Sequence, residues 1–281
     1  MSIDQGSVTK DRAVHATRRQ PSLWLAGGVA AVYASIFTGT QLASGIGYQE
    51  MFSSASNAWH GPVLGLALGA VFLLVVRALT RWDHLWKDAS RLRMRWPMWL
   101  ALGAFGAATL ARFAVASWSA VDGGLLAAIL VAGALVGLTE ELLFRGFVLR
   151  ALRGKARCEG VAVLVTTLAF GSMHLLNVLQ GNTVAQGFEQ LVLASLTGLT
   201  LYLFRRSTGL LVVAMAAHAL WDISTFLPSG APGLNVTVSL LAALGGLVAL
   251  VSVVRHDRTP ALPRPDTDRP AVSRADLAEA A

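Results

Sequence analysis

Six ionisable side chains interrupt apolar stretches of this chain at spacings that suit acid–base chemistry. They are Glu140, Glu141, Arg145, His174, His218 and Asp222. An acid or a base at the centre of a membrane-spanning helix costs about 2.5–3.5 kcal/mol, so such groups usually face a bundle interior or a water-filled cavity. We therefore treat these six residues as candidates for a functional site inside a membrane.

The first group divides into two parts when it is placed on a helix. Gly133, Gly137, Glu141 and Arg145 are spaced four residues apart and share one face. The two glycines predict the close approach of a second helix, and Glu141 precedes Arg145 in the order that favours an ion pair. Glu140 lies about 100° around the axis and has no partner on its own helix. A buried carboxylate of this kind suits a general base if another helix supplies a histidine.

The histidines come in two further pairs at helical spacing. His174 follows Phe170 by one turn, and His218 precedes Asp222 by one turn. Counting inward from the basic loops at about 1.5 Å per residue places Glu140 and the three ionisable groups of these pairs at depths of about 18–25 Å. The sequence therefore predicts that Glu140, both histidines and Asp222 form one polar layer.

The elements that position these groups are apolar blocks too long for a soluble fold. Of 281 residues, 54% are hydrophobic and 14% are charged. We expect an all-α protein, a polytopic transmembrane bundle of about eight spanning helices with a polar site within the membrane. The blocks cover residues 23–47, 61–79, 96–118, 124–149, 160–177, 188–204, 210–227 and 236–254.

Lysine and arginine are distributed unevenly between the connections. They precede the first block and follow the second, fourth and sixth blocks, whereas the alternate connections contain none. This pattern predicts an integral cytoplasmic (inner) membrane protein with both the N and C termini in the cytoplasm. The formal net charge of +7 then reflects topology and attraction to anionic lipid headgroups, so we expect the lipid bilayer and no nucleic acid as a partner.

The chain divides into a body and two tails. Residues 1–20 and 257–281 are polar or proline-rich and predict disordered cytoplasmic tails. Residues 21–256 predict one integral-membrane domain. Tryptophans near the block ends predict anchors at the membrane interface; these are Trp24, Trp59, Trp82, Trp96, Trp99 and Trp118.

Three segments of the chain carry motifs of a known family. Glu140-Glu141-Leu142-Leu143-Phe144-Arg145 matches EExxxR, Phe170-Gly171-Ser172-Met173-His174 matches FxxxH, and His218-Ala219-Leu220-Trp221-Asp222 matches HxxxN/D. In this order they resemble the CAAX prenyl endopeptidase and bacteriocin-processing (CPBP) family of intramembrane proteases. The resemblance covers about residues 96–227.

This resemblance implies an intramembrane endopeptidase that acts on a peptide or a membrane-anchored protein. Glu140 with His174 would activate the attacking water, and His218 with Asp222 would bind the developing oxyanion or a metal. Supporting residues would be Glu141 and Arg145, which would hold the geometry of the site.

Asp222 departs from the asparagine that most often ends the third motif. An ionised aspartate repels an oxyanion, so Asp222 favours orienting His218 or ligating a metal. Glu140, His174, His218 and Asp222 would then be ligands of one divalent metal such as zinc, as in a metalloprotease. A metal-free, glutamate-dependent mechanism is the alternative, and the sequence does not decide between them.

Other interpretations follow from the same residues. Glu141 with Arg145 can be a purely structural buried pair, and His218 with Asp222 an interhelical clamp. A catalytically silent membrane scaffold, or an accessory protein in immunity or secretion, is therefore one alternative function; a proton-coupled carrier is another. Arg112 lies within the third block without a motif, so we expect it to pair with Asp222 or Glu141 or to extend toward the membrane surface.

Overall fold

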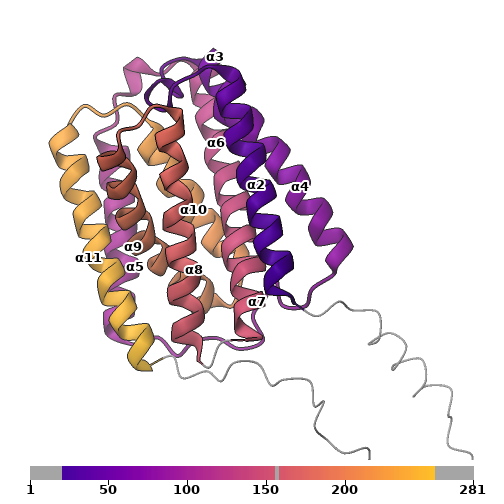
Figure 1. The fold of residues 1–281 in the computed structure, drawn as a ribbon. Helices are drawn as coiled ribbons and strands as arrows, with labels where there is room; N and C mark the ends of the chain where they lie inside the picture. Colours follow the sequence, from indigo (N-terminus) through magenta and orange to yellow (C-terminus); the bar gives the residue numbers. More distant parts are fainter. Residues whose placement is uncertain (1–20, 156–157, 257–281) are drawn as a thin grey trace, which may run out of the picture.

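The structure is a computed structural model that describes residues 21–155 and 158–256. These residues form an all-α bundle whose long helices run side by side (Figure 1). The predicted tails, residues 1–20 and 257–281, lie outside the described residues. The elements are α2 (Leu23–Ser44), η1 (Tyr48–Glu50), α3 (Ala55–Ala58), η2 (Trp59–Val63), α4 (Leu64–Thr80), α5 (Trp96–Ala114), η3 (Trp118–Ala120), α6 (Gly123–Glu140), η4 (Glu141–Val148), α7 (Leu149–Arg153), α8 (Glu159–Met173), η5 (His174–Gln180), α9 (Val184–Thr208), α10 (Leu211–Phe226) and α11 (Pro232–His256).

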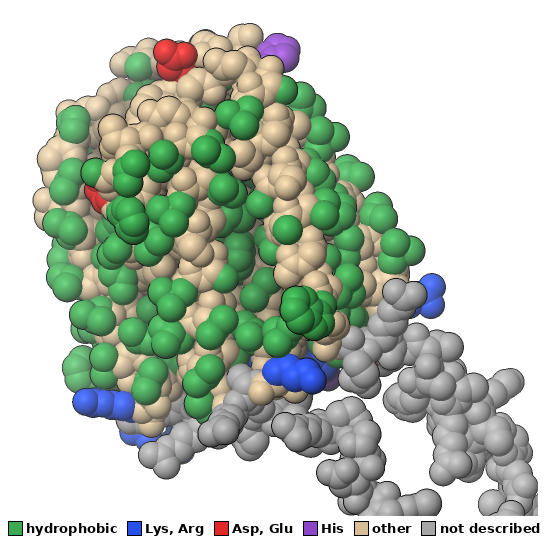
Figure 2. Space-filling view, viewed as in Figure 1, with side chains coloured by type: hydrophobic (Ala, Val, Ile, Leu, Met, Phe, Trp, Pro, Cys, Tyr) green, Lys and Arg blue, Asp and Glu red, His purple; other side chains and the backbone are tan. Residues whose placement is uncertain are grey.

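Each of the eight apolar blocks corresponds to one helical segment of the bundle, as predicted. In the described part of the chain, six segments are long and apolar enough to cross a membrane, and α10 is apolar but shorter. Figure 2 shows hydrophobic side chains over the middle of the molecule and Lys and Arg side chains at its lower end. The helix α2 begins and α11 ends at this same end (Figure 1).

Local capping explains where the helices begin and end. Asp122 accepts a hydrogen bond from the backbone N–H of Leu125 at 2.8 Å and starts α6. Thr183 and Gln186 form a capping box, so α9 begins four residues before the predicted block. Gly209, with a φ of 74°, ends α9 in the left-handed conformation that glycine adopts without strain.

The predicted close approach to Gly133 and Gly137 is confirmed, and α10 is the helix that makes it. A Cβ atom built on Gly133 would lie 3.1 Å from the carbonyl oxygen of Ala219. One built on Gly137 would lie 3.0 Å from the backbone nitrogen of Ala219 and closer still to the carbonyl oxygen of Met215. The two glycines therefore let α10 lie close enough to α6 for its side chains to reach the end of that helix.

Replacing Gly137 by valine is expected to lower the free energy of unfolding by about 1–3 kcal/mol, the usual cost of overpacking. The added atoms would meet the backbone of α10, which cannot move aside as a flexible side chain can. Denaturant unfolding in detergent micelles measures the change. Gly103→Ala on α5 is the matched control, because a Cβ there meets nothing within 4 Å. Equal stability of the two variants would contradict the prediction.

Two of the predicted spanning helices change their winding where ionisable residues occur. The helix that begins as α6 continues as a π-helix, η4, from Glu141, and α8 tightens into a 3₁₀-helix, η5, from His174. A π-helix holds more residues per turn than an α-helix, and such segments occur frequently at functional sites. In this π-helical segment Glu141 contacts His218 on α10, and Arg145 contacts Gly198 on α9.

The connection between α4 and α5 packs into the bundle, which corrects the prediction that Trp82 is an anchor at the membrane interface. Trp82 and Leu85 are each 1% exposed, and the Trp82 ring meets Phe147 edge-on with centroids 5.5 Å apart. Lys87 pairs with Leu210 in an antiparallel bridge. The connection therefore lies against the turn between α9 and α10 and closes the basic end of the bundle.

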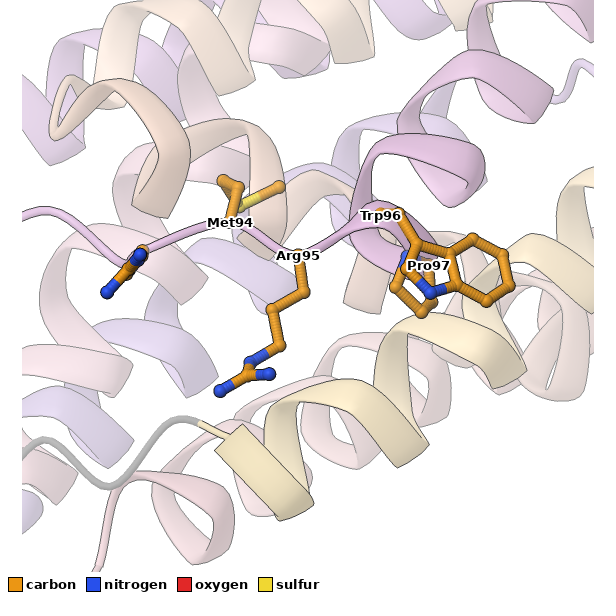
Figure 3. A pocket seen from close by; sticks show the side chains of 5 residues that line it. Met94, Arg95, Trp96 and Pro97 are labelled. Carbon is orange, nitrogen blue, oxygen red and sulfur yellow. The ribbon is translucent and has the colours of Figure 1, made fainter.

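A small surface pocket of about 430 Å³ lies where this connection enters α5. In Figure 3 the Arg95 side chain extends away from the ribbon, and Trp96 lies beside Pro97 in the first turn of the helix. The pocket is lined by Arg93, Met94, Arg95, Trp96 and Pro97, so it holds none of the candidate acids or histidines.

Candidate active site

The four predicted catalytic residues line one cavity inside the bundle. Its volume is about 760 Å³, and Glu140, His174, His218 and Asp222 all form part of its wall. The wall also includes residues of the connections at the end of the bundle opposite the basic loops; these are Gln49, Ser53, Ala120 and Pro228. The cavity therefore extends from the ionisable layer toward that end.

Glu141 binds two partners through a single carboxylate oxygen. Its Oε1 accepts a hydrogen bond from Arg145 Nη1 at 2.7 Å, which confirms the predicted ion pair. The same oxygen lies 2.9 Å from His218 Nδ1 on α10. The side chains of Glu141 and Arg145 are 0% and 1% exposed. Glu141 thus fixes the orientation of the His218 ring, a contact that sequence spacing did not indicate.

His218 lies between three carboxylates. Its Nδ1 faces Glu141, and its Nε2 lies 3.5 Å from Asp222 Oδ2 and 3.8 Å from Glu140 Oε2. The predicted pairing of His218 with Asp222 is therefore present. Of the two histidines, His218 is the one in ion-pair contact with Glu140, whereas the sequence had paired Glu140 with His174.

His174 is held by the backbone at the junction of α8 and η5. Its Nδ1 lies 3.1 Å from the carbonyl oxygen of Phe170, which can only accept a hydrogen bond. Nδ1 therefore donates this hydrogen bond, and in the neutral imidazole Nε2 keeps a free lone pair. The Phe170 ring meets His174 and His218 edge-on, with centroids 5.2 and 5.7 Å away, and so packs against both histidines.

Arg145 ties this arrangement to two further helices. Its Nη2 donates to the carbonyl oxygen of Gly198 on α9 at 2.8 Å, and its guanidinium carbon lies 4.4 Å from the centre of the Phe170 ring. A Cβ on Gly198 would lie 2.8 Å from Arg145 Nη2 and 3.0 Å from Phe170. Gly198 is therefore needed for the site, and nothing in the sequence distinguished it from other helical glycines.

Replacing Arg145 by methionine is expected to lower the free energy of unfolding by about 3–5 kcal/mol, because Glu141 would keep a buried charge without its cation. Denaturant unfolding in detergent measures the loss. Arg150→Met on α7 is the control, since Arg150 is only half-buried and donates to the carbonyl oxygen of Asp83. We expect the control to cost less than about 1 kcal/mol; similar losses in both variants would contradict the prediction.

Arg112 is buried, and its hydrogen bonds go to neutral groups, while Asp222, one of its expected partners, interacts with it electrostatically. Its Nη1 and Nη2 donate to the hydroxyls of Thr225 and Ser239, and its guanidinium carbon lies 4.4 Å from the centre of the Trp221 ring. Arg112 is 8% exposed, so it does not extend to the membrane surface. The two hydroxyls belong to α10 and α11, which are distant from α5 in sequence but pack around the Arg112 side chain.

The four residues predicted as metal ligands do not form a preassembled metal site. Within residues 21–155 and 158–256, no group of three or more His, Cys, Asp and Glu side chains is arranged to hold a metal ion. His218 has one ring nitrogen engaged by Glu141, and the described polar contact of His174 is to the backbone. The ligand types suit zinc, so the metal-dependent alternative stays a prediction.

One comparison with known proteins matches the part of the chain that contains the candidate site. Residues 122–224 match the family model described as Type II CAAX prenyl endopeptidase Rce1-like. No curated protein and no solved structure matches the chain. The matched residues include all three motifs, from Glu140 to Asp222. Over residues 122–224 the chain is therefore similar to the Rce1-like family of proteases, in agreement with the resemblance that the motifs indicate.

Proposed function

We propose that this protein is an intramembrane endopeptidase that hydrolyses peptide bonds of a membrane-associated protein or peptide. The observation that carries the proposal is the convergence of Glu140, His218 and Asp222 in one cavity with His174. These residues lie within the segment that matches a protease family. A purely structural contact between His218, Asp222 and their neighbours would not require a cavity of about 760 Å³ beside it.

Glu140 is the general base of the proposed reaction. A water molecule between Glu140 and the free Nε2 of His174 gives a proton to Glu140, and its oxygen attacks the carbonyl carbon of the peptide bond. The carbonyl oxygen becomes an oxyanion as the tetrahedral intermediate forms. Glu140 then gives the proton to the leaving nitrogen as the C–N bond breaks. One peptide and one water yield a carboxylic acid and an amine.

His218 stabilises the oxyanion in this scheme. Both of its ring nitrogens face carboxylate oxygens, which is the pattern expected when each nitrogen carries a proton. Glu141 holds Nδ1–H, so Nε2–H is directed into the cavity, where it can donate to the oxyanion. Asp222 and the pair of Glu141 with Arg145 orient this donor and offset its charge.

A divalent metal such as zinc is the alternative way of activating the water. Glu140, His174, His218 and Asp222 would hold the metal, which would lower the pKa of a bound water and polarise the peptide carbonyl. Metal content of the purified protein and its activity after chelation test this alternative directly.

We place the protein in the cytoplasmic (inner) membrane with the basic end of the bundle in the cytoplasm. Support comes from the lysines and arginines in the connections at that end. Because the cavity extends toward the opposite end, this orientation has the peptide reaching the site from the outer half of the bilayer.

N-terminal peptide profiling of membranes tests the proposed function. Cells lacking the protein are compared with cells that express either the native chain or Glu140→Gln at matched levels. We expect new N-termini only with the native chain, and these would also identify the substrate. Identical profiles, with both proteins inserted and folded, would overturn the proposal in favour of a scaffold or accessory protein. Proton flux in liposomes would then distinguish a carrier.

A further inference from the structure

Gln180 is a buried amide on the cavity wall, and its side chain has hydrogen-bonding capacity that the bundle does not use. It is 6% exposed, and both Oε1 and Nε2 lack a partner among the described residues. It ends η5 and lines the cavity. Buried polar atoms in folded proteins nearly always have a partner. An amide with two unpaired atoms on a cavity wall therefore indicates that a ligand binds there.

The neighbouring amide side chains are already bound to one another. Asn177 Nδ2 donates to Gln190 Oε1 at 2.8 Å, and Gln49 Nε2 donates to Asn182 Oδ1 at 2.9 Å. Asn182 Nδ2 also donates to Gln190 Oε1, at 3.4 Å, and so joins the two pairs. This network holds the connection between η5 and α9 against η1 without using Gln180. A structural role in the network therefore does not explain the Gln180 amide.

The winding of η5 places Gln180 on the same face as a histidine of the site. A 3₁₀-helix has three residues per turn, so His174, Asn177 and Gln180 lie one above the other. All three line the cavity. If α8 continued as an α-helix, Gln180 would lie about 240° around the axis from His174 and would leave this face. The change of winding at His174 therefore brings a second polar group to the cavity.

The rise along η5 sets the distance between the two groups. Six residues at about 2.0 Å each separate Gln180 from His174 by about 12 Å along the helix axis. An extended peptide advances about 3.3–3.6 Å per residue. A peptide whose cleaved bond lies beside His174 would therefore place main-chain groups at Gln180 three or four residues away from that bond.

A primary amide is complementary to one residue of an extended peptide. Its oxygen accepts and its nitrogen donates, and the N–H and C=O groups of one residue in a strand can both bind the same neighbour. We propose that Gln180 binds the substrate main chain at one residue, three or four positions from the cleaved bond, by accepting from its N–H and donating to its C=O. This inference rests on the proposed endopeptidase function. It makes Gln180 a specificity-determining residue that recognises extended backbone rather than a particular side chain.

Peptides with single amide-to-ester replacements test the proposal with the purified full-length protein in lipid nanodiscs. Each replacement removes one N–H donor from the main chain with almost no change in size. The parent peptide is one that the native protein cleaves, and the ester is placed at each residue in turn on both sides of the cleaved bond. We expect kcat/KM to fall by about 10-fold at one position three or four residues from that bond, because Gln180 Oε1 would stay buried and unpaired.

Variants of the amide show whether Gln180 causes this loss. Gln180→Leu should abolish it, because no acceptor is then left unpaired, and Gln180→Glu, which keeps an acceptor, should retain part of it. Gln186→Leu on α9 removes the same group from an exposed residue that does not line the cavity, and it should leave the loss unchanged. The loss is a ratio of two peptides within one protein sample, so it does not depend on how much of a variant is folded. Absence of a loss at that distance, or a loss that persists in Gln180→Leu, would overturn the proposal.

Binding separates this inference from failure of the proposed function. If no peptide is cleaved, displacement of a fluorescent peptide from the Glu140→Gln protein still reports on the main-chain site. The peptide is then chosen from a random library by its binding, and its single esters are the competitors. An ester that binds more weakly to Glu140→Gln, but not to the Glu140→Gln, Gln180→Leu double variant, would support the site without hydrolysis. Esters that bind like the parent peptide, esters that are weakened equally in both proteins, or no binding of any peptide would overturn it.

Discussion

Replacing Glu140 by glutamine is expected to lower kcat by about 10²- to 10⁴-fold, the range that general acid–base catalysis contributes. Glutamine keeps the size of the side chain in the cavity wall but cannot accept the proton of water. Glu140 is close to His218 at 3.8 Å without forming a short hydrogen bond, so its loss should change the fold little. KM for a substrate peptide should therefore stay within a few-fold of the native value.

Steady-state cleavage of a peptide identified by profiling measures this effect. Glu189→Gln is the matched control, because Glu189 is an exposed carboxylate on α9 that does not line the cavity. It should retain native activity. A Glu140→Gln protein that is folded and cleaves within 10-fold of the native rate would show that another group is the base, and Asp222 would then be the next candidate.

Replacing Asp88 by asparagine is expected to lower the free energy of unfolding by about 3–5 kcal/mol, because buried arginines would lose their counter-charge. Asp88 Oδ1 lies 2.7 Å from Arg205 Nη2 and 2.9 Å from Arg153 Nη1, and Oδ2 lies 3.1 Å from Arg206 Nη1. Arg205 also donates to the carbonyl oxygen of Arg145. The change should therefore also disturb the ion pair of Glu141 with Arg145 and reduce activity.

The pKa of Asp88 predicts how this contribution depends on pH. Burial acts to raise the pKa, but the charges of Arg205 and Arg153 and their hydrogen bonds outweigh it and lower the pKa from 3.8 to about 2. A lowered pKa means that the stabilisation is complete above pH 3.8 and is lost as the pH falls toward 2. The shift corresponds to about 2 kcal/mol.

Denaturant unfolding in detergent at pH 6 and at pH 2.5 measures both effects. The difference between the native protein and Asp88→Asn should be large at pH 6 and should shrink at pH 2.5. Glu50→Gln, at an exposed carboxylate in η1, should change stability by less than about 0.5 kcal/mol at pH 6. A difference between native and Asp88→Asn that is independent of pH would show that the carboxylate charge is not what stabilises this end of the bundle.

The lengths of the apolar blocks and the spacing of the ionisable residues were enough to predict the architecture and the residues of the polar layer. Long apolar blocks can only be buried in a bilayer or in one another, so the eight helical segments followed from composition and length. Contacts between residues four apart on one helix were also determined, because helical periodicity alone brings them together. The ion pair of Glu141 with Arg145 and the pair of His218 with Asp222 are of this kind.

Contacts between helices could not be predicted in this way, because they depend on how the helices pack. The bond from His218 to Glu141, rather than one from His174 to Glu140, depends on how α6 and α10 are rotated and on the change to a π-helix at Glu141. Neither the rotation of a helix nor a local change of its winding is visible in a 3.6-residue period.

The same reason applies to the charges near the ends of the bundle. The positive-inside pattern counts every arginine in a connection, whether its side chain is buried or exposed. The sequence therefore could not show that three arginines are buried around Asp88; these are Arg153, Arg205 and Arg206. For Arg112 the sequence likewise predicted carboxylate partners. The packing of α5 against α10 and α11 instead places two hydroxyl groups within hydrogen-bonding distance of its guanidinium. Charge and periodicity are properties of single segments, whereas the environment of a buried cation is a property of all the helices that surround it.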